Sequence, residues 1–271
     1  MAYTRGANII NFTPEFPPFT IVFQFVLAVV RLIDWLFYRI SITGRENLAQ
    51  AQAAVLVSNH TLLLDPGIIA HAISPCRTYF TMLEDTALIP FLGTFVRLLG
   101  AVPIPESPGA LRTLDSAARV ALRRLGFIHF FPEGECYRGA QELHPFHPGA
   151  FLLACRLNVP ILPVTTVLHE QRWLGRRSFR LFGRTLRVPP RVTIIVGRPV
   201  QPQPDLLPAA DAQGNGFALK RAARTLSRQV QDIMQSTIDR AGGSRAFYRG
   251  VMPRLVKHDE ARTAQGAARV G

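Results

Sequence analysis

The stretch Asn59-His60-Thr61-Leu62-Leu63-Leu64-Asp65 places a histidine and a carboxylate where a strand should end and a helix should begin. The apolar run at residues 54–57 precedes it and predicts a buried strand. Residues 66–73 follow it and have the character of a helix start. A neutral imidazole in such a place can take a proton from a hydroxyl while a nearby carboxylate holds its tautomer. His60 and Asp65 are therefore candidates for a catalytic pair.

A purely structural interpretation of the same residues is also open. On one continuous helix, residues five apart lie about 140° from each other, so His60 and Asp65 meet only if the loop between them curls back. Asp65 could instead cap the helix, with Pro66 as its first residue. The spacing alone does not decide between a catalytic pair and a helix cap.

Charge and apolar content narrow the range of partners. The 271 residues include 31 Lys and Arg against 18 Asp and Glu, which gives a net charge of +13, and 48% of them are hydrophobic. A surface both basic and apolar favours an anionic membrane, or an acidic carrier protein, before nucleic acid. The arginine-rich stretch 172–191 could contact nucleic acid or lipid headgroups, but a solvated hairpin explains it equally well. We expect no nucleic-acid partner.

The cysteines and histidines show no metal or disulfide pattern. The three cysteines, Cys76, Cys136 and Cys155, form no C-x-x-C pair, and the seven histidines lack metal-binding spacing. We therefore expect a reducing compartment and no metal or redox cofactor.

Residues 19–38 form the most apolar segment of the chain. Its polar residues Gln24, Arg31 and Tyr38 recur at seven-residue spacing, and Asp34 lies one turn from the last two, so a helix would carry them as one stripe. The stripe favours a helix that lies in the membrane interface, or between lipid and protein. A single membrane span and a core helix are the alternatives.

Alternating strands and helices predict an α/β fold with a single mixed, mostly parallel sheet flanked by helices, after an N-terminal hydrophobic or amphipathic helical segment. The strands are expected at residues 40–44, 54–57, 79–82, 101–105, 127–131, 159–166 and 191–197, and the helices at 66–73, 91–99, 111–125, 151–157 and 219–238. We divide the chain into a membrane-associating segment at 1–39, a domain at 40–241 and a partly disordered basic tail at 242–271. His60 and Glu133 follow predicted strands, so both should face one crevice at the carboxyl edge of the sheet.

Five short motifs, in order, resemble those of the glycerolipid acyltransferases of the 1-acylglycerol-3-phosphate acyltransferase type. They span about residues 40–200, and the ordered set is specific although each motif alone is weak. The motifs are Thr43-Gly44-Arg45-Glu46-Asn47-Leu48, the H-x-x-x-x-D motif at 60–65, Phe131-Pro132-Glu133-Gly134, Pro145-Phe146 with Gly149-Ala150-Phe151, and Val159-Pro160-Ile161-Leu162-Pro163-Val164.

This resemblance implies transfer of an acyl group from acyl-CoA or acyl carrier protein to a hydroxyl of a lipid acceptor, at the cytoplasmic face of a membrane. His60 would be the general base, and Asp65 would orient its ring. Backbone amides near Gly134 would be candidates to stabilise the oxyanion. The expected substrate-binding residues are Asn59, Glu133, Gly134 and Arg138. No cofactor beyond the acyl donor is implied.

The chain departs from the family pattern at two places where an arginine should bind the acceptor's phosphate. Pro105 and Glu106 stand at the first place, and Glu135-Cys136-Tyr137 stands at the second, where T-R-S is usual. The next arginine, Arg138, comes two positions late. Loss of both arginines favours an acceptor without a phosphate monoester, such as an amino-acid or neutral lyso-lipid. A non-catalytic lipid-binding relative is the remaining alternative.

Overall fold

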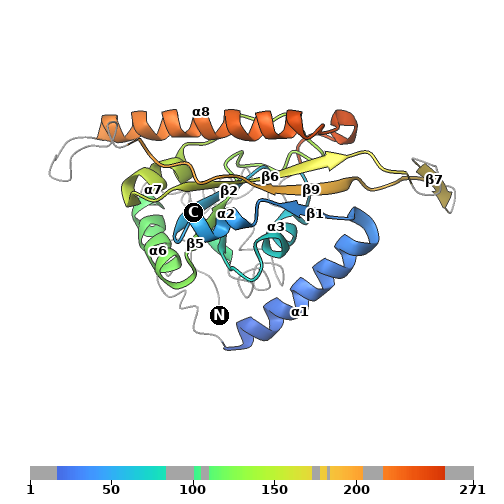
Figure 1. Ribbon diagram of the computed structural model, residues 1–271, viewed down its shortest axis with the longest axis horizontal. Coiled ribbons are helices and arrows are strands. Elements are labelled where there is room, and N and C mark those ends of the chain that lie inside the picture. Colours follow the sequence, from blue (N-terminus) through green and yellow to red (C-terminus); the bar gives the residue numbers. More distant parts are fainter. Residues whose placement is uncertain are drawn as a thin grey trace, which may run out of the picture.

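A seven-stranded sheet with the order β1-β9-β6-β2-β5-β3-β4 forms the centre of the computed structural model (Figure 1). The model describes residues 17–83, 101–104, 110–172, 178–181, 184–203 and 216–253. The strands are β1 Ser41–Thr43, β2 Ala54–Ser58, β3 Tyr79–Leu83, β4 Ala101–Ile104, β5 Phe127–Phe130, β6 Ile161–His169 and β9 Arg191–Val196. All neighbouring strands are parallel except β6 and β9. The predicted mixed, mostly parallel sheet is confirmed.

Helices cover both faces of this sheet because its central strands are apolar on both sides. Val55 and Val57 of β2 face α6 Ala110–Leu125, α7 Gly149–Leu157 and α8 Gly216–Arg240. Ala54 and Leu56, which alternate with them, face the cluster that contains residues of α1 Pro17–Ile33, α2 Glu46–Gln50 and α3 Asp65–Ile73. Figure 1 shows α8 and α1 on opposite sides of the sheet.

Several other predicted elements are confirmed, and the rest fall on segments outside the described residues. The helices expected at 111–125, 151–157 and 219–238 are present. The stretch 172–191 contains an antiparallel hairpin, β7 Ser178–Leu181 and β8 Arg184–Arg187, which extends away from the sheet in Figure 1. The predicted helix 91–99 lies outside the described residues, as do residues 254–271 of the predicted tail. Residues 242–253 are described and include a short 3-10 helix, η3 Arg245–Phe247.

The polar stripe of the N-terminal segment contacts the protein at its C-terminal end, whereas Gln24 is exposed. Helix α1 continues into a π-helical turn, η1 Asp34–Tyr38. Arg31 donates a hydrogen bond of 3.0 Å to Ser74 Oγ, and Asp34 Oδ2 lies 2.8 Å from His71 Nδ1. Asp34 is buried. These polar contacts hold α1 and η1 against α3.

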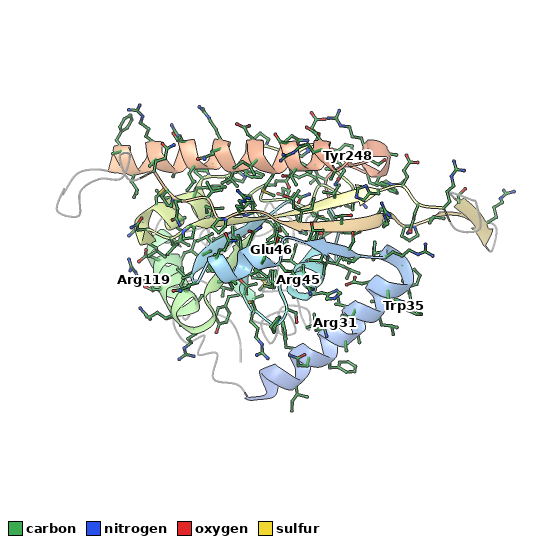
Figure 2. The ribbon with its side chains drawn as sticks, in the orientation of Figure 1. Arg31, Trp35, Arg45, Glu46, Arg119 and Tyr248 are labelled. Atoms are coloured by element: carbon green, nitrogen blue, oxygen red, sulfur yellow. The ribbon has the colours of Figure 1, made fainter. Side chains whose placement is uncertain are left out.

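The opposite side of α1 and η1 exposes apolar side chains. Arg31 and Trp35 project from different sides of this segment (Figure 2). The exposed large apolar residues of α1 and η1 are Ile21, Phe25, Val29, Leu32, Trp35, Leu36 and Phe37. Among the described residues, none of the helices combines the length and the apolar character needed to cross a bilayer.

Helix α1 packs against α3 at Gly67, and this contact gives a test of how α1 is seated. A Cβ atom at Gly67 would lie 2.9 Å from Val30 Cγ2. We expect Gly67→Leu to displace α1 and to destabilise the protein by about 1–3 kcal/mol, the usual range for overpacking. The measurement is the thermal unfolding midpoint.

Gly216→Leu is the matched control, because a Cβ atom at Gly216 would meet nothing within 4 Å. It should leave the midpoint near that of the wild type. Equal midpoints for Gly67→Leu and Gly216→Leu would show that α1 is not tightly packed on α3.

Candidate active site

The register of the sheet brings His60 next to the turn that follows β5. Val57 of β2 is paired with Phe130 of β5, so the residues after both strands emerge side by side. The His60 ring stacks on Phe131, with centroids 4.0 Å apart and an angle of 19° between the planes. The two segments predicted to share a crevice therefore meet at the carboxyl edge of the sheet.

Asp65 and His60 are in direct contact because the intervening loop curls back. Asp65 Oδ2 lies 2.9 Å from His60 Nδ1, and it also accepts hydrogen bonds from the backbone N–H groups of Thr61 (2.7 Å) and Leu62 (2.8 Å). Leu64 occupies the helix-cap position, and Asp65 is the first residue of α3. The Asp65 carboxylate is thus turned away from its own helix, toward the loop and the imidazole.

The surroundings of His60 favour its charged form. Burial lowers the pKa of the imidazole, but interactions with Asp65 and Cys136 outweigh burial and raise the pKa to about 10. Asp65 is fully buried, whereas the His60 side chain is 19% exposed. Because Asp65 occupies Nδ1, Nε2 is the ring nitrogen left to exchange a proton with a substrate.

Glu133 supports the backbone of His60. Its Oε1 accepts a hydrogen bond of 2.9 Å from the His60 N–H, and its Oε2 accepts one of 3.1 Å from the His144 N–H. Burial raises the pKa of the Glu133 carboxyl to about 7, against the effect of these two donors. Each oxygen of Glu133, which is a predicted acceptor-binding residue, thus accepts one hydrogen bond from the main chain.

The other three predicted substrate-binding residues occupy different positions around this pair. Asn59 is buried, and its side chain exchanges two hydrogen bonds with the backbone of Thr166, so it ties β2 to β6. Gly134 has φ +74°, and its N–H donates to Phe131 O at 3.1 Å, within the turn. Arg138 is exposed and donates a hydrogen bond of 3.2 Å to Arg249 O.

Sequence reasoning missed the part that Cys136 plays in this site. Cys136 is only 5% exposed, and it contributes to the raised pKa of His60. The next residue, Tyr137, donates its N–H to His60 O at 2.9 Å, which fixes the two segments together. Cys136 had been noted only as a departure from a motif, because nothing in the sequence places it beside His60.

The C-terminal segment was also missed as a structural support of the site. Arg138 N–H donates to Gly250 O at 3.1 Å, Arg249 N–H donates to Arg138 O at 2.8 Å, and Met252 N–H donates to Cys136 O at 2.8 Å. Residues 249–252 therefore pair with the segment that carries Cys136, which in turn pairs with the segment that carries His60. No periodicity or turn signal in the sequence indicates this pairing.

A second histidine, His129, lies beside the site but is neutral. It is fully buried, its Nε2 lies 2.8 Å from Ser58 Oγ, and its ring packs edge-on against Phe131. Burial, with a smaller contribution from the charge of His60, lowers the pKa of His129 to about 3. Within the part of the chain that the structure describes, no three His, Cys, Asp or Glu side chains are grouped so as to hold a metal ion.

Comparisons with known proteins relate this chain to acyltransferases. Residues 39–167 match the model of the acyltransferase family. A 1-acyl-sn-glycerol-3-phosphate acyltransferase of Chlamydomonas reinhardtii is 30% identical over 190 residues, which cover 67% of this chain and 53% of that protein. One of Saccharomyces cerevisiae is 30% identical over 148 residues, which cover 54% of this chain and 48% of that protein. The chain spans about half the length of these relatives.

A solved structure shares the fold. The 1-acyl-sn-glycerophosphate (LPA) acyltransferase PlsC of Thermotoga maritima matches 87% of this chain and 88% of its own, with a TM-score of 0.55. The two sequences are 18% identical, so this likeness concerns the fold.

The Glu133 carboxylate accepts hydrogen bonds from two backbone N–H groups. These bonds can be tested with Glu133→Gln at pH 8, where the wild-type carboxyl is mostly ionised. The amide NH₂ group would face one of two backbone donors and leave that N–H unsatisfied, which costs about 1–3 kcal/mol. We expect a lower unfolding midpoint and faster hydrogen exchange of the His60 or His144 amide.

Glu142→Gln is the control, because Glu142 is exposed and pairs only loosely with Arg245, at 3.7 Å. It should change neither quantity. Unchanged amide exchange in Glu133→Gln would mean that Glu133 does not hold the His60 backbone.

Proposed function

Because residues 39–167 match the acyltransferase family, we propose that this chain is an O-acyltransferase acting at a membrane surface. It would move a fatty acyl group from a thioester donor, acyl-CoA or acyl carrier protein, to a hydroxyl of a lyso-lipid. The observation that carries this proposal is the His60–Asp65 pair, with Nδ1 and Oδ2 2.9 Å apart at the carboxyl edge of the sheet. The pair supplies the base that a hydroxyl nucleophile requires.

In the proposed reaction, His60 Nε2 takes the proton of the acceptor hydroxyl as the oxygen attacks the thioester carbonyl. Asp65 holds the ring through Nδ1 and stabilises the imidazolium that forms. The imidazolium then gives its proton to the departing thiolate. Glu133 acts as a positioning residue, because it fixes the backbone of His60 through a 2.9 Å hydrogen bond.

The class of acceptor headgroup is proposed from the residues that follow Glu133 and Gly134 in the sequence. Cys136 and Glu135 stand where the family pattern has arginine and threonine, and Arg138 is tied to the carbonyl of Arg249. These features favour a lyso-lipid whose headgroup is not a phosphate monoester, with lysophosphatidic acid as the alternative in which Arg138 binds the phosphate. An acceptor panel of lysophosphatidic acid, zwitterionic lysophospholipids and neutral or amino-acid lyso-lipids distinguishes the two.

The membrane-docking surface is proposed to be the exposed apolar side of α1 and η1, defined above. This segment packs on α3, the helix that begins with Asp65, and Leu63 between His60 and Asp65 is also exposed. Docking there would bring a lipid acceptor close to the base. The net charge of +13 favours an anionic surface, and free cysteines fit the cytoplasmic face.

His60→Gln tests the base. We expect a loss of about 10²–10⁴-fold in the rate of acyl transfer, which is the usual contribution of general-base catalysis. The assay measures free thiol released from acyl-CoA and from acyl carrier protein over the acceptor panel. Because only neutral His60 accepts a proton and its pKa is raised to about 10, the wild-type rate should increase as the pH rises above 7.

His169→Gln is the matched control, since His169 lies outside the pair and contacts Thr193 instead. It should retain wild-type activity. A loss smaller than about tenfold in His60→Gln would exclude His60 as the base, and a wild-type protein inactive with every donor and acceptor would favour the non-catalytic alternative.

The docking surface can be tested with the double variant Phe25→Ser, Trp35→Ser. Burying one large apolar side chain stabilises by about 1.5–3 kcal/mol, so we expect binding at least about tenfold weaker. Vesicles of phosphatidylcholine and anionic phosphatidylglycerol are suitable, with flotation as the measurement.

Phe217→Ser is the control, because Phe217 is 81% exposed but lies on α8, on the opposite side of the sheet. If the double variant floated as well as this control, another surface would have to bind the membrane.

A further inference from the structure

We propose that the acceptor headgroup carries an ammonium group and that the stacked rings of Tyr137 and His144 bind it. This inference rests on the proposed acyltransferase function and names the class of its acceptor. The centroids of the two rings lie 3.4 Å apart, with an angle of 11° between the planes. Both residues are partly exposed, and neither ring takes part in the reaction proposed above.

Both members of this ring pair are tied to the backbone of His60. Tyr137 N–H donates a hydrogen bond of 2.9 Å to His60 O. The Glu133 carboxylate accepts from the N–H groups of His60 and His144, at 2.9 and 3.1 Å. A headgroup bound at the rings would therefore stay beside the base, because the same hydrogen bonds position the rings and the base.

The segment that contains the two rings is acidic, although the chain as a whole is strongly basic. Residues 131–147 include three Glu and one Arg, whereas the whole chain has 31 Lys and Arg against 18 Asp and Glu. The single arginine, Arg138, donates a hydrogen bond of 3.2 Å to Arg249 O. Charges of this sign attract a cation and repel a phosphate dianion.

Aromatic rings and carboxylates are suitable partners for an ammonium ion. A cation within about 6 Å of a ring centroid is attracted by the negative face of the ring. Tyr137 and His144 provide such rings, and Glu135, two residues before Tyr137, adds a negative charge to the same segment. Glu135 is also partly exposed. These residues fit a headgroup that ends in an ammonium group better than one that ends in a phosphate monoester.

The test compares lysophosphatidylethanolamine with lysophosphatidylglycerol, because both contain a phosphodiester and only the first carries an ammonium group. An amino-acid lyso-lipid with a terminal ammonium and no phosphate shows which of the two ammonium-bearing headgroups is preferred. The assay measures the thiol that the full chain releases from palmitoyl-CoA or palmitoyl-acyl carrier protein. We expect kcat/KM to be at least about tenfold higher for the ammonium-bearing acceptors than for lysophosphatidylglycerol.

Tyr137→Leu removes one of the two rings. It should raise KM for the ammonium-bearing acceptors at least about fivefold more than KM for lysophosphatidylglycerol, and the change should appear in KM rather than in kcat. Tyr137→Phe should restore the preference, because the aromatic face remains. Tyr248→Leu is the matched control, since Tyr248 is an exposed tyrosine near the end of α8 (Figure 2), and it should keep the wild-type preference.

Glu135→Gln provides a second variant if Tyr137→Leu fails to fold, as judged by thermal unfolding. Loss of the negative charge should raise KM for the ammonium-bearing acceptors and lower KM for lysophosphatidic acid, whose phosphate then meets less repulsion. A purely structural role of Glu135 would not move the two acceptors in opposite directions. An unchanged preference in Glu135→Gln and in folded Tyr137→Leu would overturn the assignment.

Further outcomes separate this inference from the proposed function. If the wild type acylates lysophosphatidylglycerol or lysophosphatidic acid as well as the ammonium-bearing acceptors, the ammonium site is excluded and the acyltransferase function stands. The same conclusion holds if Tyr137→Leu weakens the use of every acceptor equally, because the rings then only support the site. If the wild type transfers palmitate to no acceptor from either donor, both proposals fail.

Discussion

One oxygen of Asp65 organises the whole site. Asp65 Oδ2 accepts from two backbone N–H groups, Thr61 and Leu62, and from the imidazole of His60. Such charge-assisted hydrogen bonds in a buried place are strong, and each donor would be costly to bury alone. They force the loop to curl back, set the start of α3 and fix the ring. His60 and Asp65 are five residues apart and would point in different directions on a continuous helix. The curled loop brings their side chains into contact.

Glu133, which follows β5, fixes the backbone of His60 in the way that Asp65 fixes its ring. Because its carboxylate joins His60 N–H to His144 N–H, the two buried carboxylates hold His60 by its ring and by its backbone. Burial raises the pKa of Glu133, the negative charge of Asp65 adds to this effect, and the positive charge of His60 opposes it. The imidazolium is therefore the charge that makes two neighbouring buried carboxylates tolerable.

The sequence predicted those features that depend on local pattern. Continuous apolar runs at 54–57 and 127–131 correspond to fully buried strands, and their ends had to meet because parallel strands share an edge. The sequence did not show that Arg31 and Asp34 contact the protein, because their partners, Ser74 and His71, belong to another segment. Nor could the place of Cys136 be read, because it is set by pairing with residues more than a hundred positions away.

The pairing of residues 249–252 with the segment around Cys136 has a consequence for biosynthesis. The chain emerges from the ribosome with α1 first and this supporting segment only after α8. The apolar side of α1 is thus made before residues 249–252 pair with the segment that carries Cys136 and supports His60. If α1 docks on a membrane as proposed, a nascent chain meets that surface before the support of the His60 site is in place.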